Sequence, residues 1–92
     1  METEPVRIPI TDELDLHLFQ PRDYPELLPD YLEECLKAGI AEVRIIHGKG
    51  TGKLREAVRK ALRKNQHIAS WEEGKDGEGG AGVTVAQLIE QG

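Results

Sequence analysis

A glycine-rich stretch separates a hydrophobic segment from an amphipathic basic segment. Its seven residues are His47, Gly48, Lys49, Gly50, Thr51, Gly52 and Lys53. A glycine loop between a strand and a helix presents backbone N–H groups beside the positive end of the helix dipole, and glycine permits the close backbone approach and positive φ that an anion requires there. Lys49 and Lys53 add full charges, and Thr51 can cap the helix or donate to an oxygen. This stretch, the glycine loop, is therefore predicted to bind phosphate.

Two nucleotide-binding motifs do not fit the glycine loop. A Walker A loop, G-x-x-x-x-G-K-[ST], needs glycine where His47 stands and serine or threonine where Leu54 stands. A dinucleotide fingerprint needs a longer, two-halved sheet and an acidic residue that ends a following strand, and the chain provides neither. We therefore expect the phosphate to belong to a nucleic acid and not to a nucleotide cofactor.

A second chemical cluster lies in Glu13–His17, whose alternating pattern predicts a strand with one apolar face. The same alternation puts Asp15 and His17 together on the other face. If this strand neighbours the one that ends at His47, a carboxylate and two imidazoles could converge on one phosphate as base, acid and orienting group. The alternative is that both histidines are structural.

The charge distribution indicates a polyanionic partner for this region. The net charge is −5, but eight of the twelve lysines and arginines lie between Arg44 and Lys64, where Glu56 is the one acid. That segment carries +7 and the remainder of the chain −12. Such asymmetry is typical of a surface that faces nucleic acid, although a solvated helix face is the alternative. Arg55 joins the predicted substrate-binding residues on this basis.

Four strands and two helices can be assigned around these clusters. The strands are predicted at Glu13–His17, Glu42–His47, His67–Trp71 and Val83–Ile89. One helix is expected from about Pro29 to Gly39, because prolines interrupt the chain before it, and the other follows the glycine loop. Right-handed crossovers then predict an α/β (α+β) two-layer sandwich, β-α-β-α-β-β, with two helices on one face of a mixed four-stranded sheet.

The chain is short enough for one compact domain, predicted at residues 12–90 behind an N-terminal arm at residues 1–11. The single cysteine, Cys35, cannot form an intrachain disulfide, which indicates a reducing compartment. The sequence holds neither a secretory signal pattern nor an apolar run long enough to span a bilayer. We therefore expect a cytoplasmic monomer with no membrane partner.

These motifs together resemble those of the small MutS-related (Smr) domain family. The resemblance runs from about Glu13 to Leu88, and its marks are Leu14-Asp15-Leu16-His17, the run Val43–Gly52, the helix after the glycine loop, and Gly79–Val85. The resemblance implies a β-α-β-α-β-β two-layer sandwich and an endonuclease that nicks DNA or cleaves RNA. It also implies a catalytic role for Asp15 and His17 and substrate binding by His47–Gly50.

The predicted site therefore combines the two clusters. Its catalytic residues are Asp15, His17 and His47, and its substrate-binding residues are Gly48, Lys49, Gly50, Thr51, Gly52, Lys53 and Arg55. In the implied reaction, His17 moves a proton while Asp15 orients it, and the glycine loop stabilises charge on phosphorus. An RNA 2′-hydroxyl nucleophile needs no metal, whereas attack of water on DNA favours Mg²⁺ at Asp15; no cofactor is required by the sequence.

Two features keep other functions open. Where the best-known family members have glycine after the first histidine, this chain has Leu18-Phe19, which predicts narrower access to the site or a binding-only branch. The second function is thus a non-catalytic nucleic-acid or ribosome-binding module that uses the same surface. A third is a protein-binding adaptor on the uncovered sheet face, which predicts no salt-dependent affinity for nucleic acid.

Overall fold

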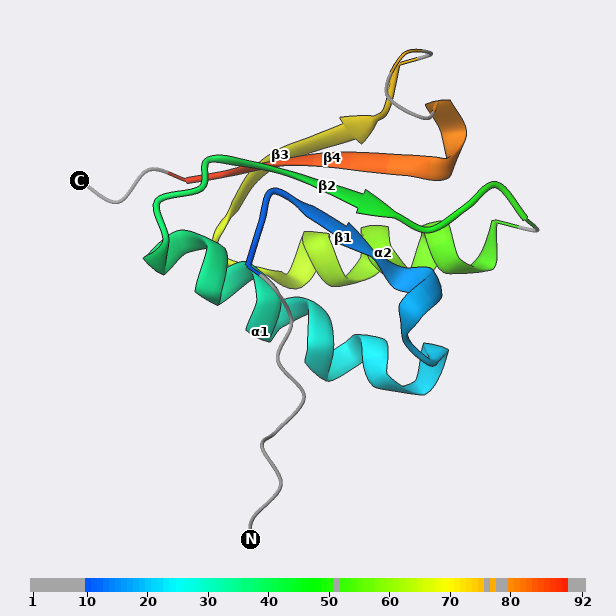
Figure 1. Ribbon diagram of the computed structural model, residues 1–92, viewed down its shortest axis with the longest axis horizontal. Helices are drawn as coiled ribbons and strands as arrows, with labels where there is room; N and C mark the ends of the chain where they lie inside the picture. Colours follow the sequence, from blue (N-terminus) through cyan, green and yellow to red (C-terminus); the bar gives the residue numbers. More distant parts are fainter. Residues whose placement is uncertain (1–9, 51, 76, 78–79, 90–92) are drawn as a thin grey trace, which may run out of the picture.

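The structure is a computed structural model that describes residues 10–50, 52–75, 77 and 80–89. It has two layers, a four-stranded sheet and a pair of helices (Figure 1). The strands are β1 Glu13–Asp15, β2 Glu42–Ile46, β3 Ile68–Glu73 and β4 Val83–Leu88; the helices are α1 Tyr24–Lys37 and α2 Lys53–Lys64; short 3-10 turns are η1 Leu16–Leu18, η2 Pro21–Asp23 and η4 Gly80–Gly82. The predicted fold class is confirmed.

The order of strands in the sheet brings the two chemical clusters to one edge. The order is β1-β2-β4-β3, with β1 parallel to β2 and the other neighbours antiparallel. In the parallel pair Asp15 lies opposite Ile46, so both strands end at the same place. Both helices cover the same face of the sheet, as Figure 1 shows. Consequently η1 and the glycine loop leave the sheet side by side.

The hydrophobic core lies between the sheet and the helices. Val43 and Ile45 of β2 and Leu32 of α1 are fully buried, and Val58 and Leu62 of α2 pack into the same cluster. Because α2 turns these two residues toward the sheet, its basic side chains lie on the flanks and the outer face of the helix.

Several element boundaries differ from the sequence prediction: β2, β3 and β4 by one or two residues, and β1 and α1 in ways that shape the site. β1 ends at Asp15 instead of His17, because the Asp15 side chain accepts the backbone N–H of His17 and turns the chain into η1. α1 begins at Tyr24 instead of about Pro29, because proline is tolerated in the first helical turn, where Pro25 lies. Pro29 itself lies inside the helix.

The predicted division into an arm at residues 1–11 and a domain at 12–90 stays a prediction, since residues 1–9 lie outside the described part of the chain. Thr11, next to this boundary, is tied to the domain because its carbonyl accepts the hydroxyl of the buried Tyr31 at 2.5 Å. Among the described residues, no helix combines the length and the apolarity that a membrane crossing requires.

Truncation of a buried helix residue tests the core. Leu32→Ala removes a side chain with 0% exposure and should lower the free energy of unfolding by roughly 2–5 kcal/mol, measured by urea denaturation. Leu36→Ala, one turn away and only half-buried, is the control and should lower it less. Equal losses for the two variants would contradict this assignment of the core.

Candidate functional site

Asp15 and His17 form a hydrogen-bonded pair at the end of β1. Asp15 Oδ1 accepts the backbone N–H of His17 at 2.9 Å and lies 2.9 Å from His17 Nδ1. A carboxylate only accepts, so Nδ1 carries the proton and Nε2 is left as the free ring nitrogen. The side chains are 40% and 58% exposed, respectively. The predicted pair thus comes together, through a capped turn instead of strand alternation.

Tyr24 stabilises the η1 turn through a side-chain hydrogen bond. Its hydroxyl donates to the carbonyl of Leu16 at 3.0 Å, and the backbone N–H of Phe19 donates to the same oxygen at 3.0 Å. Burial, with a contribution from the negative charge of Asp15, raises the pKa of Tyr24 above its ordinary value. Tyr24 therefore remains a protonated donor and fixes the residue that lies between Asp15 and His17.

The two chemical clusters meet at Gly48. A Cβ built on this glycine would lie 2.9 Å from His17 Nε2, so the free imidazole nitrogen faces the glycine loop. Gly48 also has a φ of +81°, a conformation that side chains disfavour. Glycine is thus required at this position for two independent reasons.

The second histidine has a different environment from the first. His47 is 2% exposed; its Nδ1 lies 2.9 Å from the Gly48 carbonyl, and its Nε2 lies 2.9 Å from the Thr84 hydroxyl. A carbonyl only accepts, so Nδ1 donates to Gly48 and Nε2 accepts from Thr84. Both ring nitrogens are therefore engaged within the protein. This geometry fits a positioning residue for the loop, whereas the sequence suggests a catalytic one.

The pKa of His47 is lowered, first by burial and then by the positive charges of Arg55 and Arg59; the hydrogen bond to Gly48 and the charge of Glu73 act in the opposite direction. His47 is consequently neutral at physiological pH. A neutral ring suits the donor and acceptor roles that its two partners assign to it.

The N-terminus of α2 forms the other half of the glycine loop. Gly52 is the N-cap residue, with φ +88°, and as glycine it offers no capping side chain. The N-terminus of α2, where backbone N–H groups and the helix dipole favour an anion, thus lies at the glycine loop. The Arg55 guanidinium curls back to within 3.3 Å of the Cβ position of Gly52. Lys49, Gly50 and Lys53 are exposed.

Gly48 has a different role from the one predicted for the glycine loop, and Thr51 is not described by the structure. The Gly48 N–H donates to the carbonyl of Gly82 at 2.9 Å, as that of His47 does at 3.0 Å, so Gly48 contributes shape and not a donor to a phosphate. Thr51 lies outside the described residues. The helix cap predicted for Thr51 is occupied by Gly52.

The bulky residues after His17 leave the site accessible. Leu18 is 77% exposed, and Phe19 packs its half-buried ring against the core. Neither side chain removes His17 from solvent, because the imidazole keeps 58% of its exposure. The narrower access expected from Leu18-Phe19 is therefore not what the geometry shows.

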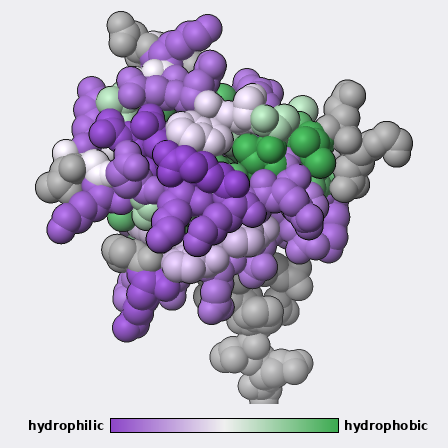
Figure 2. Space-filling model, turned by 180° about the vertical axis from the view of Figure 1, so that it is seen from behind, coloured by the Kyte–Doolittle hydropathy of each residue, from purple (hydrophilic) through white to green (hydrophobic). Residues whose placement is uncertain are grey.

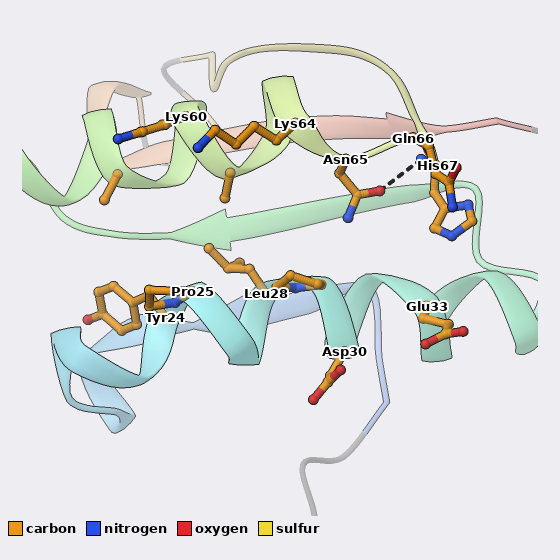
Figure 3. Close-up of a pocket in the computed structure, with 13 residues that line it drawn as sticks. Tyr24, Pro25, Leu28, Asp30, Glu33, Lys60, Lys64, Asn65, Gln66 and His67 are labelled. Carbon is orange, nitrogen blue, oxygen red and sulfur yellow. Dashed lines mark hydrogen bonds between the residues drawn. The ribbon is translucent and has the colours of Figure 1, made fainter.

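A small hollow adjoins Gly48 on the uncovered face of the sheet. It has a volume of about 450 Å³ and is lined by Arg44, Lys49 and Gly82, among others. A larger groove of about 830 Å³ lies elsewhere, between α1 and α2 (Figure 3), and none of the predicted site residues lines it. We take the smaller hollow as part of the site, because it touches the loop and carries two cations.

The side chains around Asp15 determine whether a metal ion could bind there. No group of three or more histidine, cysteine or acidic side chains that could hold a metal ion occurs among the described residues. Asp15 is also engaged twice by His17. A magnesium ion at Asp15 would take its remaining ligands from substrate phosphate and water, because the described residues do not form a metal cage there.

Three residues of the site were missing from the sequence prediction. Gly82 and Thr84 lie in the late glycine-containing segment that marks the family resemblance, so a signal existed, but their roles depend on pairing with β2. Tyr24 acts on a residue eight positions earlier, and nothing in its spacing indicated this.

Comparisons with known proteins agree with this geometry. The family profile of the Smr domain matches residues 14–89. The protein named Endonuclease MutS2 from Symbiobacterium thermophilum is 46% identical over 81 residues, which is 88% of this chain and 10% of that protein. Its counterpart from Halothermothrix orenii is 54% identical over 61 residues, 66% of this chain and 8% of that one. The chain thus spans about a tenth of the length of the curated relatives it matches.

Two solved structures share the fold. The crystal structure of the Smr domain of Thermus thermophilus MutS2 matches with a TM-score of 0.79 and 39% identity, covering 86% of this chain and 99% of that one. The crystal structure of YdaL, a stand-alone small MutS-related protein from Escherichia coli, matches with a TM-score of 0.75 and 26% identity, covering 86% and 65%.

Alanine substitutions of two loop glycines, Gly48 and Gly50, test whether the two chemical clusters meet at Gly48. Gly48→Ala should destabilise the fold by about 1–2 kcal/mol, because alanine disfavours positive φ, and should displace the His17 ring, which lies 2.9 Å from the new methyl group. Urea denaturation and the NMR signals of the His17 imidazole measure the two effects. Gly50→Ala, whose Cβ meets nothing within 4 Å, is the control. An unchanged His17 signal in Gly48→Ala would show that the ring does not face this glycine.

The burial of His47 predicts a pH dependence of stability. Because its pKa in the folded protein lies below the ordinary value of 6.5, the unfolded chain takes up a proton that the folded protein refuses. The contribution of His47 to stability is therefore complete above about pH 6.5 and declines as the pH falls toward the lowered pKa. His47→Gln should show a weaker loss of unfolding free energy between about pH 7 and pH 5 than the unmodified protein. Parallel profiles would contradict the lowered pKa of His47, because they would mean that its pKa is the same in the folded and unfolded chains.

Proposed function

This chain belongs to the Smr domain family, and from that membership and the geometry of its site we propose that it is a nucleic-acid endonuclease that uses the Asp15–His17 pair. The observation that carries the proposal is the free Nε2 of His17, which an Asp15 hydrogen bond orients and which faces Gly48 of the glycine loop. The base and the anion site thus lie close enough together to contact the same phosphate. The names of its relatives, which include Endonuclease MutS2, support the same function.

In this proposal the scissile phosphate lies against the N-terminus of α2. The N-terminal end of that helix and the Arg55 guanidinium stabilise the negative charge that develops on the phosphoryl oxygens. Lys49 contributes a further positive charge from the hollow beside Gly48. His47 holds the loop in shape through Gly48 and Thr84 and does not exchange a proton with the substrate.

The single oriented imidazole favours RNA as the substrate. His17 Nε2 accepts the proton of a 2′-hydroxyl, the 2′-oxygen forms a bond to phosphorus, and the bond from phosphorus to the 5′-oxygen breaks. The imidazolium then returns the proton to the departing 5′-oxygen, which leaves a 2′,3′-cyclic phosphate and a 5′-hydroxyl. Asp15 stabilises the imidazolium between these steps. The nucleophile belongs to the substrate, so one base suffices.

A binding module without catalysis, including one that binds the ribosome, is the second candidate. One observation favours it: His47 has both nitrogens engaged, so one imidazole instead of two is available for proton transfer. The basic loop and helix would serve this function equally well. Cleavage, and not binding, is therefore the measurement that separates the candidates.

The proposed function is tested with end-labelled RNA and DNA of one sequence, each with Mg²⁺ and with EDTA. RNA cleavage that persists in EDTA and yields cyclic phosphate ends is expected, while the DNA binds without being cut. The double variant Asp15→Asn with His17→Gln should reduce the rate roughly a hundredfold or more and leave binding almost unchanged. Glu13→Gln is the matched control, since Glu13 is an exposed acid of the same strand that pairs with Arg44 instead of His17.

The outcomes distinguish the two candidates. RNA cleavage by the double variant at the unmodified rate would remove the catalytic role of the pair. Salt-dependent binding without any cleavage would leave the binding module. Absence of both binding and cleavage would overturn the assignment to nucleic acid.

A further inference from the structure

The cations of α2 are sorted by type onto two flanks of the helix. Arg55, Arg59 and Arg63 follow each other at intervals of four residues and therefore form one stripe. Lys60 and Lys64 lie on the opposite flank, where they line the groove against α1 (Figure 3). The two flanks carry similar charge but differ in chemistry, because a guanidinium is planar, stacks on rings and binds phosphate with two parallel N–H groups.

The arginine stripe lies over an aromatic ring of the edge strand. The Cζ atoms of Arg59 and Arg63 are 5.1 and 5.6 Å from the ring centroid of the half-buried Trp71 in β3. These are cation–π distances. The ring holds the two guanidinium groups in place. Because β3 is an edge strand of the sheet, the cluster of Arg59, Arg63 and Trp71 lies at the edge of the molecule.

The stripe has hydrogen-bonding capacity that the protein does not use. The Nε atoms of Arg55 and Arg59 are buried and have no hydrogen-bond partner among the described residues. Arg59 has one acidic neighbour, Glu73, at the long distance of 3.8 Å. Within the described chain no acidic side chain pairs with Arg55 or Arg63. The buried Nε atoms are inaccessible in this conformation, so a ligand would be bound by the outer nitrogens of the guanidinium groups.

The stripe starts at the phosphate site. Arg55 is the residue that curls back toward Gly52 of the glycine loop, and both Arg55 and Arg59 contribute to the lowered pKa of His47. Positions four residues apart on a helix are about 6 Å apart along its axis, which is close to one nucleotide step of an extended backbone. The stripe therefore continues the loop in the direction of Trp71 with the periodicity of a polynucleotide.

We propose that a single strand of nucleic acid runs from the glycine loop along the Arg55–Arg59–Arg63 stripe to Trp71. This inference rests on the proposed function and adds the path and the strandedness of the substrate. Successive phosphates lie along the stripe, and an unpaired base stacks at the Arg63–Trp71 end. A single strand is specified because bases in a duplex do not expose a face to an aromatic or guanidinium plane.

The surface around this path agrees with such a ligand. Seen from behind, the molecule is predominantly hydrophilic, and hydrophobic colour is concentrated at one side (Figure 2). The large hydrophobic side chains with substantial exposure among the described residues are Ile10, Leu18 and Ile89, and none belongs to the stripe. The polar, arginine-rich character indicates a polyanion here in preference to an apolar protein partner.

The experiment uses Trp71 as its own reporter, because it is the only tryptophan of the chain. The protein is titrated with an uncleavable 2′-O-methyl dinucleotide, with a 2′-O-methyl strand of about ten nucleotides, and with a duplex of the longer one. The longer single strand should bind more tightly and change the Trp71 emission. The short strand, which reaches only the loop, and the duplex should leave the emission nearly unchanged.

Two neutralising variants of adjacent residues separate the path from general electrostatics. Arg63→Gln should weaken binding of the long strand by roughly threefold to fivefold, reduce the salt slope by about 0.7 and suppress the emission change. Lys64→Gln removes the same charge from the opposite flank and should do none of these. Both residues are exposed, and thermal unfolding checks that both variants fold.

Equal effects of the two variants, or a long strand that binds no better than a short one, would overturn the proposed path while leaving the phosphate site intact. A duplex that changes the Trp71 emission as the single strand does would overturn the strandedness. Failure of the unmodified protein to bind any oligonucleotide would instead overturn the proposed function, and the path with it.

Discussion

The parallel pairing of β1 with β2 is the constraint on which the rest of the site depends. It is the only parallel pair in the described sheet, and its register sets Asp15 opposite Ile46. Parallel strands end at the same edge of a sheet, so the residues that follow them must emerge together. A register shifted by one residue would turn Leu14 away from the core and would separate His17 from Gly48. Burial of Leu14, at 3% exposure, thus also fixes the geometry of the proposed catalytic pair.

Most of the fold could be predicted from the sequence, because each element carries its own signal. The β-branched run of β2 and the helical spacing of α2 are local patterns that need no knowledge of neighbours. The ends of the helices and strands were harder to predict. The end of β1 is decided by one side-chain cap, and the start of α1 by the tolerance of its first turn for Pro25; strand alternation and a general rule against proline cannot register either effect.

The residues of the site likewise divide into those that local sequence patterns predict and those whose roles depend on distant partners. Asp15 and His17 are two positions apart in the sequence, so their pairing could be predicted, even though a turn and not a strand brings them together. The state of His47 could not, because its partner Thr84 lies 37 residues away on a strand whose register no local pattern specifies. The sorting of arginines and lysines on α2 was present in the sequence spacing, but its meaning depends on Trp71, which a different strand supplies.

The shape of the glycine loop depends on a part of the chain that follows much later. The carbonyl of Gly82 receives the N–H groups of both His47 and Gly48, and Thr84 completes the bonding of the buried imidazole. Synthesis proceeds from the N-terminus, so His47 and Gly48 are made before Gly82, which accepts from both, and before Thr84, which donates to His47. The nascent chain therefore contains the basic helix α2 before the glycine loop has its partners, and the loop takes its final shape only when β4 has been made and has paired with β2.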